Sequence, residues 1–407
     1  MIKYLGSKRA LVGVLGALAD AAGARTAVDL FTGTTRVAQE FCRRGVVPTA
    51  VDTASYSLVL GRCYVETDAA DVDPAEVSEA LERLEALPPR RGYVTETFCE
   101  ASRFFHPDNG VRIDAIRDGI DELYGDSPLR PILLTALLEA ADRVDSTVGV
   151  QMAYLKSYAP RARQPLRLRA PVLTPGGGLA VQADARAYAA SMAPVDLAYL
   201  DPPYNQHRYH GNYHVWETLI RWDAPAHYGV ACKRVDARDP ASRSPFNSRR
   251  TIHAALAETI AAVPARVVVA SVNDEGFVTV DELAGMARAR GAEVRVLAFE
   301  ARRYVGSVIG VHSPAGVKVG TAGRRRNVEH LVLTGAAAVN GTGNPLANAL
   351  AGNDAAKPAE AAEAAVTAYG SGNACQVYFD LFPRKIKLSE LEVAYPGMVE
   401  ALVQHEG

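Results

Sequence analysis

The chain has 407 residues, of which 48% are hydrophobic and 22% are charged, so it can bury one large core and form a smaller second module. Its net charge of −2 gives by itself no sign of a polyanionic partner. No apolar segment approaches the ~20 residues that span a bilayer, and the N-terminus lacks a signal-peptide core, so we expect a cytoplasmic protein without a membrane partner. The five cysteines are widely scattered, which predicts buried thiols rather than disulfides or a zinc site.

Basic residues are concentrated in three segments of this slightly acidic chain. Residues 155–170 contain five basic side chains and no acid, residues 301–326 contain six and no acid, and residues 233–250 contain six with two acids. Such segments are usually solvated faces, but three of them are more easily explained if they converge on a phosphate backbone. The prediction assigns nucleic-acid contacts to four arginines: Arg161, Arg163, Arg249 and Arg250.

The N-terminus places an aromatic ring, Tyr4, and a lysine, Lys8, four residues apart around a small-residue turn, and a helix-like segment follows to about residue 22. The stretch lacks the earlier glycine and the following Ser or Thr of a Walker phosphate loop. The two side chains could line a cofactor pocket or belong to a solvated terminus. Taken alone, the residues favour the solvated terminus.

A strand, turn and helix follow at residues 27–31, 32–35 and 36–44, and a second strand over 47–51 ends at Asp52. Gly33 allows a ligand to approach the turn closely, and Asp52 lies 19 residues later, where an acid binds ribose hydroxyls in doubly wound folds. Because the turn lacks the full Gly-x-Gly-x-x-Gly pattern, an adenosine-type cofactor fits better than a dinucleotide. The alternative is a strand-turn-helix unit that binds nothing.

The remaining elements predict an α/β fold with a Rossmann-like, mostly parallel sheet and an inserted, mainly helical region. Helices are expected at 75–87, 112–124, 129–142 and 280–290, and strands at 180–182, 196–200, 266–272, 293–299 and 330–334. The predicted division is an N-terminal core part (1–63), an insertion (64–178), a C-terminal core part (179–335), a flexible linker (336–373) and a small C-terminal segment (374–407).

The strand over 196–200 leads directly into Asp201, Pro202, Pro203 and Tyr204, a set that cannot continue regular structure. It suits methylation of an amine conjugated to an aromatic ring, whose delocalised lone pair is a poor nucleophile. The Asp201 carboxylate and the Pro202 carbonyl can each accept a hydrogen bond from that amine, and the prolines hold the carbonyl rigidly. Tyr204 offers a flat face for an extruded base. The alternative is a tight turn after a core strand.

The segment that follows, residues 205–216, is rich in aromatic and hydrogen-bonding side chains and would suit a base and its phosphates through His207, Arg208 and Tyr209. A rival interpretation takes His207, His210 and His214 as metal ligands beside Asp201, which would indicate a metal-dependent hydrolase. Without a second nearby carboxylate, we expect no metal site.

The ordered set of motifs resembles the Dam-like (alpha-group) family of DNA adenine-specific N6 methyltransferases. It comprises Tyr4-x-x-x-Lys8, the stretch from Asp29 to Gly33, Asp52, Asp184 and Asp201-Pro202-Pro203-Tyr204. The resemblance spans roughly residues 1 to 335, and it places the insertion between the cofactor and catalytic motifs, as expected of the family's target-recognition domain.

The resemblance implies a residue-by-residue site for S-adenosylmethionine. Tyr4 and Lys8 would contact the cofactor, and Asp29, Phe31 and Gly33 would cradle its methionine end. Asp52 would bind the ribose, and Asp184 would lie near the adenine. Asp201 and Pro202 would hold the target amine, and Tyr204 would stack on the flipped adenine. The implied partners are double-stranded DNA and a possible cognate restriction endonuclease.

Two positions depart from the family pattern, because Thr35 stands where a second glycine is common and Tyr4 where tryptophan is frequent. Four alternatives remain at this stage: a cytosine exocyclic-amine methylase, an RNA methyltransferase, a non-catalytic DNA-binding relative and the hydrolase. A cytosine ring-carbon methylase would need a nucleophilic cysteine after a proline, and the sequence has no Pro-Cys pair.

Overall fold

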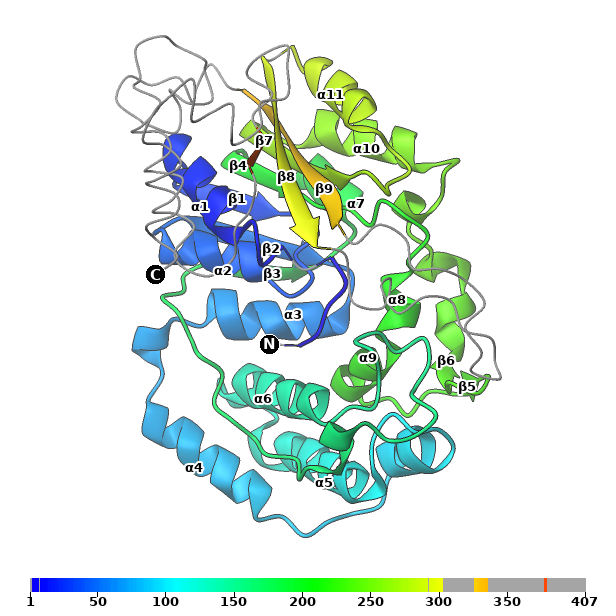
Figure 1. The fold of residues 1–407 in the computed structure, drawn as a ribbon. Helices are drawn as coiled ribbons and strands as arrows, with labels where there is room; N and C mark the ends of the chain where they lie inside the picture. The colour runs from blue at the N-terminus through cyan, green and yellow to red at the C-terminus, as the bar shows by residue number, and fades with distance from the viewer. Residues whose placement is uncertain (1, 7, 292, 303–325, 336–376, 379–407) are drawn as a thin grey trace, which may run out of the picture.

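The computed structural model describes residues 2–6, 8–291, 293–302, 326–335 and 377–378. In this part of the chain a central sheet has the strand order β3-β2-β1-β4-β7-β9-β8-β10 (Figure 1). The strands are β1 (Thr26–Asp29), β2 (Val47–Asp52), β3 (Leu179–Gln182), β4 (Val195–Leu200), β7 (Ala265–Asn273), β8 (Val294–Arg302), β9 (Arg326–Thr334) and β10 (Val377–Tyr378).

The five strands from β3 to β7 are parallel, whereas β9 runs antiparallel to both of its neighbours. The chain builds outward from β1 through β2 to β3, then returns to place β4 on the other side of β1. The carboxyl ends of β1 and β4 therefore flank a topological switch point, where open α/β sheets bind ligands. The predicted Rossmann-like fold class, with its mostly parallel sheet, is confirmed.

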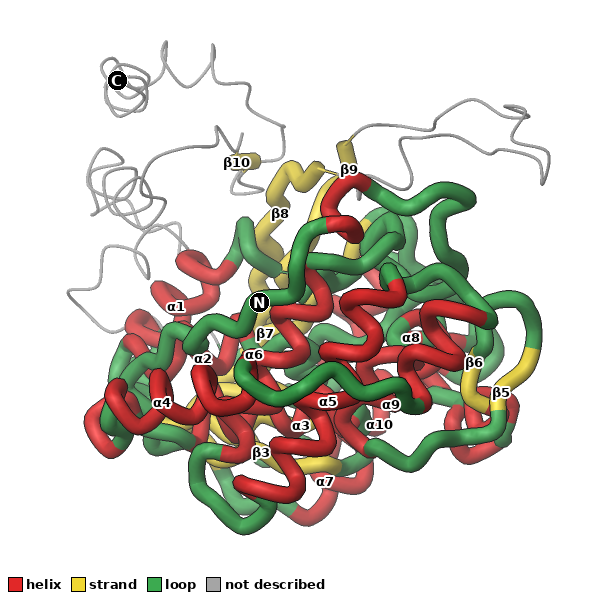
Figure 2. Tube along the Cα trace, turned by 90° about the horizontal axis from the view of Figure 1, so that it is seen from below, coloured by secondary structure: helices red, strands yellow, loops and turns green. Residues whose placement is uncertain are grey.

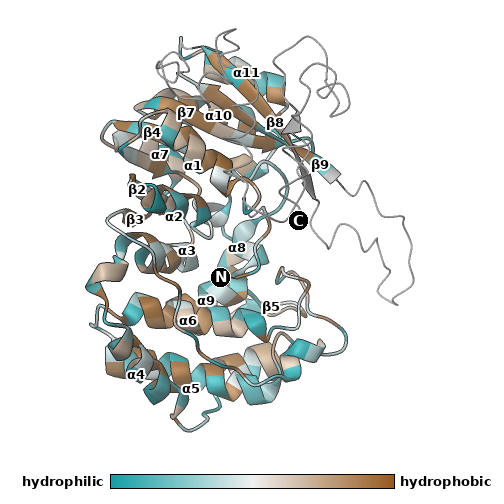
Figure 3. Ribbon diagram, turned by 60° about the vertical axis from the view of Figure 1, so that its left-hand side comes forward, coloured by the Kyte–Doolittle hydropathy of each residue, from teal (hydrophilic) through white to brown (hydrophobic). Residues whose placement is uncertain are grey.

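Both faces of the sheet are covered, which explains why its central strands are continuous apolar runs. On one face, side chains such as Leu197 and Val267 pack against α1 (Val12–Ala21) and α2 (Arg36–Arg43). On the other face, Ala198 and Val268 pack against further helices. These are α7 (Ala185–Ser191), α10 (Ile252–Ala262) and α11 (Val280–Arg288). Figure 3 shows hydrophobic residues along the central strands.

The predicted insertion forms a helical layer below the sheet in Figure 1, built from α4 (Pro74–Glu85), α5 (Pro107–Tyr124) and α6 (Arg130–Arg143). Figure 2, seen from below, shows these helices in front of the sheet. α3 (Ser55–Gly61) joins the two layers. A helix from the later part of the chain, α9 (His214–Arg221), also packs here, with Trp216 and Leu219 in the same hydrophobic cluster as the insertion. The helical layer thus contains residues from both sides of the Asp201-Pro202-Pro203-Tyr204 motif.

Several element predictions were right and several were wrong. The strands and the helices at 75–87 and 129–142 are confirmed within a few residues. The helix expected at 112–124 begins earlier, because Pro107 occupies its first turn and the His106 ring caps it, where a separating turn was expected. The segment 205–216 is not a simple loop, since it contains α8 (Tyr209–Asn212) and the start of α9. α3, α7 and α10 were not predicted.

The basic segment 233–250 begins as the second strand of a hairpin, β5 (His227–Tyr228) and β6 (Lys233–Arg234), and continues as short 3-10 turns. Most of the basic segment 301–326, the predicted linker and nearly all of the C-terminal segment lie outside the described residues. Within that segment, β10 pairs antiparallel with β8. Cys42, Cys63, Cys99 and Cys232 are buried free thiols, as predicted, and Cys375 lies outside the described residues. No described helix has the length and apolar character needed to cross a membrane.

Candidate active site

A cavity of about 550 Å³ lies at the carboxyl ends of β1 to β4, within the ~300–1,000 Å³ typical of small-molecule sites. The segments that follow these four strands contribute to its wall, which is the placement that a doubly wound sheet dictates. Eight of the residues predicted to bind the cofactor, the target base or the nucleic acid line it, namely Tyr4, Phe31, Asp52, Asp184, Asp201, Pro203, Arg208 and Tyr209. Residues far apart in the sequence are therefore brought together at one site.

The turn after β1 is held by the acid that ends β2. The Gly33 backbone N–H donates to Asp52 Oδ2 at 2.9 Å, and the Ala54 N–H donates to Oδ1 at 3.0 Å. Burial raises the pKa of the Asp52 carboxyl. Gly33 has φ +51°, and a Cβ there would lie 2.9 Å from the Tyr4 ring. The turn thus needs glycine both for its backbone angle and for its contact with Tyr4.

Thr35 adopts the left-handed conformation, with φ +62°, at the position where the resembling family commonly has glycine. Its buried hydroxyl donates to the Thr34 carbonyl at 2.7 Å and accepts from Gln39 Nε2 at 2.8 Å. These two hydrogen bonds offset the steric cost that a Cβ carries in this backbone region. The turn therefore keeps its shape without the second glycine.

Asp29 ends β1 and is almost completely buried. Its Oδ2 accepts from the Thr32 hydroxyl at 3.0 Å, while Oδ1 is buried without a hydrogen-bond partner among the described residues. Burial raises the pKa of this carboxyl to about 7, even though Thr32 opposes the shift. A buried carboxylate oxygen without a donor is costly, so this atom is suited to a ligand that brings a cation or an N–H.

Lys8 lies beside the carboxylate of Asp201. Its Nζ is 2.9 Å from Asp201 Oδ1 and 2.6 Å from Glu329 Oε1, and Glu329 also accepts from the Ser271 hydroxyl at 2.5 Å. The interpretation of Lys8 as part of a solvated terminus is wrong, because this side chain is buried against two carboxylates. Burial raises the pKa of Asp201 to about 6, with Glu329 adding to the shift and Lys8 opposing it.

Tyr204, the last residue of the motif, is buried, and Lys8 Nζ lies over its ring at 5.6 Å. Its ring is buried in the core that includes Val272 and Val278, and its hydroxyl accepts from Asn273 Nδ2 at 2.8 Å. Its carbonyl accepts from the Phe277 N–H at 2.8 Å. Tyr204, Pro202, Lys8, Asp29 and Gly33 are not among the residues that line the cavity. In this structure, Tyr204 therefore fixes the segment after β4 to the end of β7.

The profile of D12 class N6 adenine-specific DNA methyltransferases matches residues 4–258, which is more than half of the chain. The chain belongs to this family. This methyltransferase is 32% identical over 265 residues to the type II methyltransferase M.NlaIII of Neisseria lactamica, an alignment covering 63% of the chain and 77% of the relative. It is 26% identical over 283 residues to M.FokI of Planomicrobium okeanokoites, covering 65% and 43% respectively. It is 28% identical over 199 residues to M.CviAII of Paramecium bursaria Chlorella virus 1, covering 47% and 60%.

The predicted resemblance and reaction class are thereby confirmed, because the family is defined by methylation of adenine N6 in DNA. This decides against the cytosine and RNA alternatives, and the presence of both Asp201 and Tyr204 argues against a non-catalytic relative. The hydrolase alternative also fails on geometry. His214 is buried with Nε2 3.1 Å from the Gln151 carbonyl, His210 Nε2 lies 3.2 Å from Asp236 Oδ1, and His207 is exposed. Among the described residues, no cluster of His, Cys, Asp and Glu could hold a metal ion.

The predicted nucleic-acid contacts of the methyltransferase lie in different surroundings. Arg161 is 2.7 Å from Asp145 and is thus already engaged by a carboxylate, whereas Arg163 is exposed. Arg208 is exposed at the cavity. The Tyr209 ring instead belongs to the interior wall, stacked 5.2 Å from Tyr4, with its hydroxyl donating to the Leu5 carbonyl at 3.1 Å.

Arg249 and Arg250 are both exposed in the segment after β6, and the Arg249 guanidinium lies over the Phe277 ring at 4.7 Å. Sequence reasoning missed part of the cavity wall in this same region. Phe246 packs edge-to-face on Phe31 at 5.0 Å, and Asn247 donates to the Asn205 carbonyl at 2.7 Å. The only sequence signal there was the cluster of basic residues, which indicated phosphates rather than a pocket wall.

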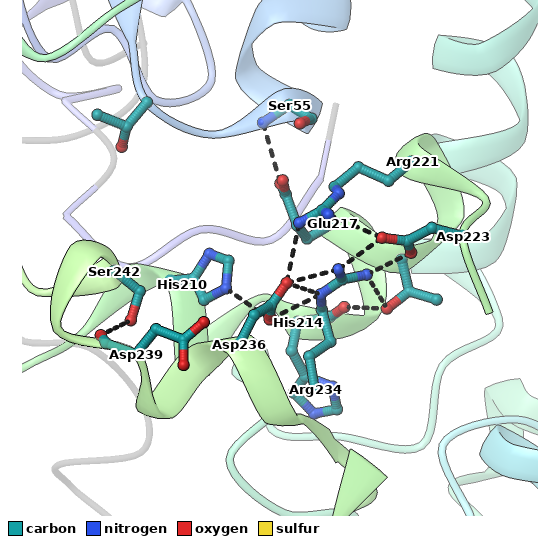
Figure 4. A network of polar contacts seen from close by, with 12 residues as sticks. Ser55, His210, His214, Glu217, Arg221, Asp223, Arg234, Asp236, Asp239 and Ser242 are labelled. Carbon is teal, nitrogen blue, oxygen red and sulfur yellow. Dashed lines mark hydrogen bonds and ion pairs between the residues drawn. The ribbon is translucent and has the colours of Figure 1, made fainter. Parts of the chain in front are cut away.

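A buried arginine, Arg234, connects the hairpin β5–β6 to this wall (Figure 4). Its side chain is 1% exposed and forms a bidentate pair with Asp223 at 2.7 Å on each arm, plus a 2.7 Å contact with Asp236. Asp236 also contacts His210 and Arg221, which both line the cavity. Although burial opposes it, Arg234 holds the pKa of Asp236 well below its usual range. The hairpin and the methyltransferase cavity therefore share one set of ion pairs.

Proposed function

We propose that the cavity binds S-adenosylmethionine and that the enzyme methylates the N6 amine of an adenine rotated out of the DNA duplex. The observation that carries this proposal is the position of Asp201, at the cavity wall after β4 and paired with Lys8 at 2.9 Å. An adenine buried in a duplex cannot present its amine to a carboxylate in a pocket, so extrusion of the base is required.

The residues around the cavity fit the parts of this cofactor. Phe31 and Phe246 supply aromatic surface for an adenine ring, next to Asp184. Asp52 accepts two backbone N–H groups, and a carboxylate has further lone pairs to accept from ribose hydroxyls. Asp29 lies outside the cavity lining, but its unpartnered Oδ1 has the chemistry that suits the cationic amino group of the methionine end. Each part of the cofactor thus has a counterpart of suitable chemistry.

When bound, S-adenosylmethionine supplies an electrophilic methyl group on its sulfonium. The protein's task is to make the adenine amine a nucleophile. The Asp201 carboxylate and the Pro202 carbonyl accept its two N–H groups, which draws the lone pair away from the ring. Lys8, held by Glu329, keeps Asp201 ionised and oriented. No covalent intermediate with the enzyme is needed.

The first experiment is incubation of the purified protein with labelled S-adenosylmethionine and unmethylated DNA, followed by nucleoside analysis. We expect label in N6-methyladenine. Asp201→Asn should lower kcat at least ~100-fold while cofactor affinity changes little, because the amine loses its anionic acceptor. The control is Asp281→Asn, an exposed carboxylate at the start of α11. Undiminished turnover of the Asp201 variant would remove this residue from its role.

The stacking role of Tyr204 is a separate part of the proposal, because its ring is buried in the structure. The variant pair Tyr204→Phe and Tyr204→Ala separates the ring from the hydroxyl that bonds Asn273. We expect the Phe variant to stay within ~3-fold of wild type and the Ala variant to lose ~5- to 150-fold in kcat/KM for DNA, the range of one stacking contact. Equal losses in both variants would assign the effect to the Asn273 bond instead.

We also propose that the enzyme protects DNA from a restriction endonuclease of the same specificity. The relatives that support this are described as type II methyltransferases and modification methylases. The test maps the methylated sequence, then incubates methylated and unmethylated DNA with an extract of the native host. Cleavage of only the unmethylated DNA at the mapped sequence is expected. An extract that cleaves neither DNA there would contradict the proposal.

A further inference from the structure

A second cavity, of about 530 Å³, lies between the insertion and the β5–β6 hairpin. Its lining comes from three stretches that are distant in the sequence: Arg103, residues 152–156 without Leu155, and residues 228–233 without Cys232. We call it the hairpin groove. Lys156 belongs to the first predicted basic segment and Lys233 to another, so two of those segments converge here. This cavity is separate in its lining residues from the cofactor cavity.

The hairpin groove combines positive charge with exposed apolar side chains. Arg103, Lys156 and Lys233 contribute cations, and none of the ten residues that line the groove is acidic. Met152 is 51% exposed and Val230, in the hairpin turn, is 79% exposed. A groove that is lined by exposed apolar side chains and three cations suits a partner that offers both negative charge and apolar surface. The charge complements a phosphate backbone, and the apolar tip complements base edges.

The two sides of the groove are anchored to the helices that form the cofactor wall. On the insertion side, Gln151 precedes Met152; its N–H donates to the Asn212 carbonyl at 2.7 Å, and its side-chain oxygen accepts from the Val215 N–H at 2.9 Å. On the hairpin side, Arg234 follows Lys233 and donates to the Thr218 hydroxyl of α9 at 3.3 Å, and its partner Asp236 lies 3.2 Å from His210 of α8. α8 and α9 therefore contact both sides of the hairpin groove, and residues of the same two helices also line the cofactor cavity.

We propose that the hairpin groove reads the DNA that flanks the target adenine, with the β5–β6 hairpin entering the major groove. Val230 and Met152 would contact base edges such as the thymine methyl group, and Arg103, Lys156 and Lys233 would contact phosphates. A two-stranded ribbon fits the width of the major groove. Target recognition would then be divided between the insertion and a hairpin that follows the catalytic motif. This inference rests on the proposed function, because it needs DNA methylation as its readout.

The test measures methylation of a DNA library with randomised bases around adenine, sequenced to give a rate for each flanking sequence. Val230→Ser and Met152→Ser should change the preference at one or two flanking positions by about 5-fold or more, the discrimination of one base contact. Lys233→Gln should weaken binding to all sequences alike and lower the salt slope of log K by about 1. The matched control is Val172→Ser, an apolar residue of the insertion that is 83% exposed and lies outside the groove.

The outcomes separate the inference from the function on which it rests. An unchanged flanking profile in both Val230→Ser and Met152→Ser, with wild-type rates, overturns the inference while leaving the methylation reaction intact. That result would assign the groove to another partner, such as a second protein. Absence of adenine methylation by the wild-type enzyme would instead overturn the proposed function. Because Val230 is exposed, its variant is expected to unfold at the wild-type temperature, and Val230→Thr serves as a second, shape-conserving variant.

Discussion

The pair of carboxylates around Lys8 predicts a pH dependence of catalysis. Asp201 must be ionised to accept the amine N–H, so kcat should fall as the pH drops through about 6, the raised pKa of this carboxyl. Glu329 contributes to that rise through its negative charge. Glu329→Gln should therefore move the acid limb of kcat to lower pH, as measured in single-turnover experiments across pH 4–8.

The same variant should lower the plateau value of kcat. Lys8 would then pair with Asp201 alone, which makes the Asp201 carboxylate a weaker hydrogen-bond acceptor for the amine. Cofactor affinity should stay near wild type. Glu258→Gln, an exposed carboxylate on α10 that pairs with Arg186, is the control. An acid limb that stays in place in Glu329→Gln would show that the charge of Glu329 does not act on Asp201.

Thr35 predicts a difference between two small substitutions. Both Thr35→Ala and Thr35→Gly remove the hydrogen bond to Gln39, but only the glycine variant also removes the Cβ from a left-handed backbone position. We expect the glycine variant to be more stable than the alanine variant by about 1 kcal/mol. Urea unfolding measures this difference. A more stable alanine variant would mean that the turn changes conformation on substitution.

At the scale of single residues, the sequence indicated the groups whose partners are close along the chain. Gly33 and Asp52 stood out because each ends or follows a strand. The contact between Lys8 and Glu329 joins residues 321 positions apart, and no local pattern marks Glu329 as special. The sequence also could not tell that Tyr204 is buried, because an aromatic ring after two prolines is compatible with either placement.

Among the elements, the hairpin β5–β6 depends on one buried guanidinium. Arg234→Ala would leave Asp223 and Asp236 with Arg221, a 41% exposed side chain, as their shared cation. Because both carboxylates remain partly exposed, we expect a loss of about 1–3 kcal/mol rather than the full penalty of a buried charge. Faster amide exchange over residues 223–236 should accompany it. Arg288→Ala, an exposed arginine on α11, should change neither quantity.

Strands were easier to predict than helices for a physical reason. A strand covered on both faces is a short, continuous apolar run, and here several runs stop at an acid. The helices that were not predicted have sequences that fit a loop as well as a helix. α9 was obscured by histidines and aromatic residues that suited a binding loop, although Val215 and Leu219 are buried in the helical core. The helix α5 was predicted to begin at residue 112 because Pro107 was assigned to a turn, whereas Pro107 is the first residue of the helix.

For the molecule as a whole, the strands beyond the region matched by the family profile complete the sheet. β7 begins at Ala265, after the match ends at residue 258, and it covers the apolar edge of β4. We propose that residues 1–335 form one folding unit. A chain of residues 1–335 should be monodisperse and unfold cooperatively, whereas a chain of residues 1–258 should aggregate because β4 becomes an open hydrophobic edge. Size-exclusion chromatography and thermal unfolding of both chains test this, and a well-folded 1–258 chain would contradict it.

The position of Glu329 on β9 has a consequence for how the enzyme is made. Asp29, Asp52 and Asp201 are all synthesised before Glu329, which follows Asp201 by 128 residues. At about 5–20 residues per second, a ribosome needs roughly 10 s to cover that interval. During this time the nascent chain contains Lys8 and Asp201 but not Glu329, the second carboxylate that pairs with Lys8. The buried pair of Lys8 and Asp201 therefore gains its second carboxylate only after β9 has been translated.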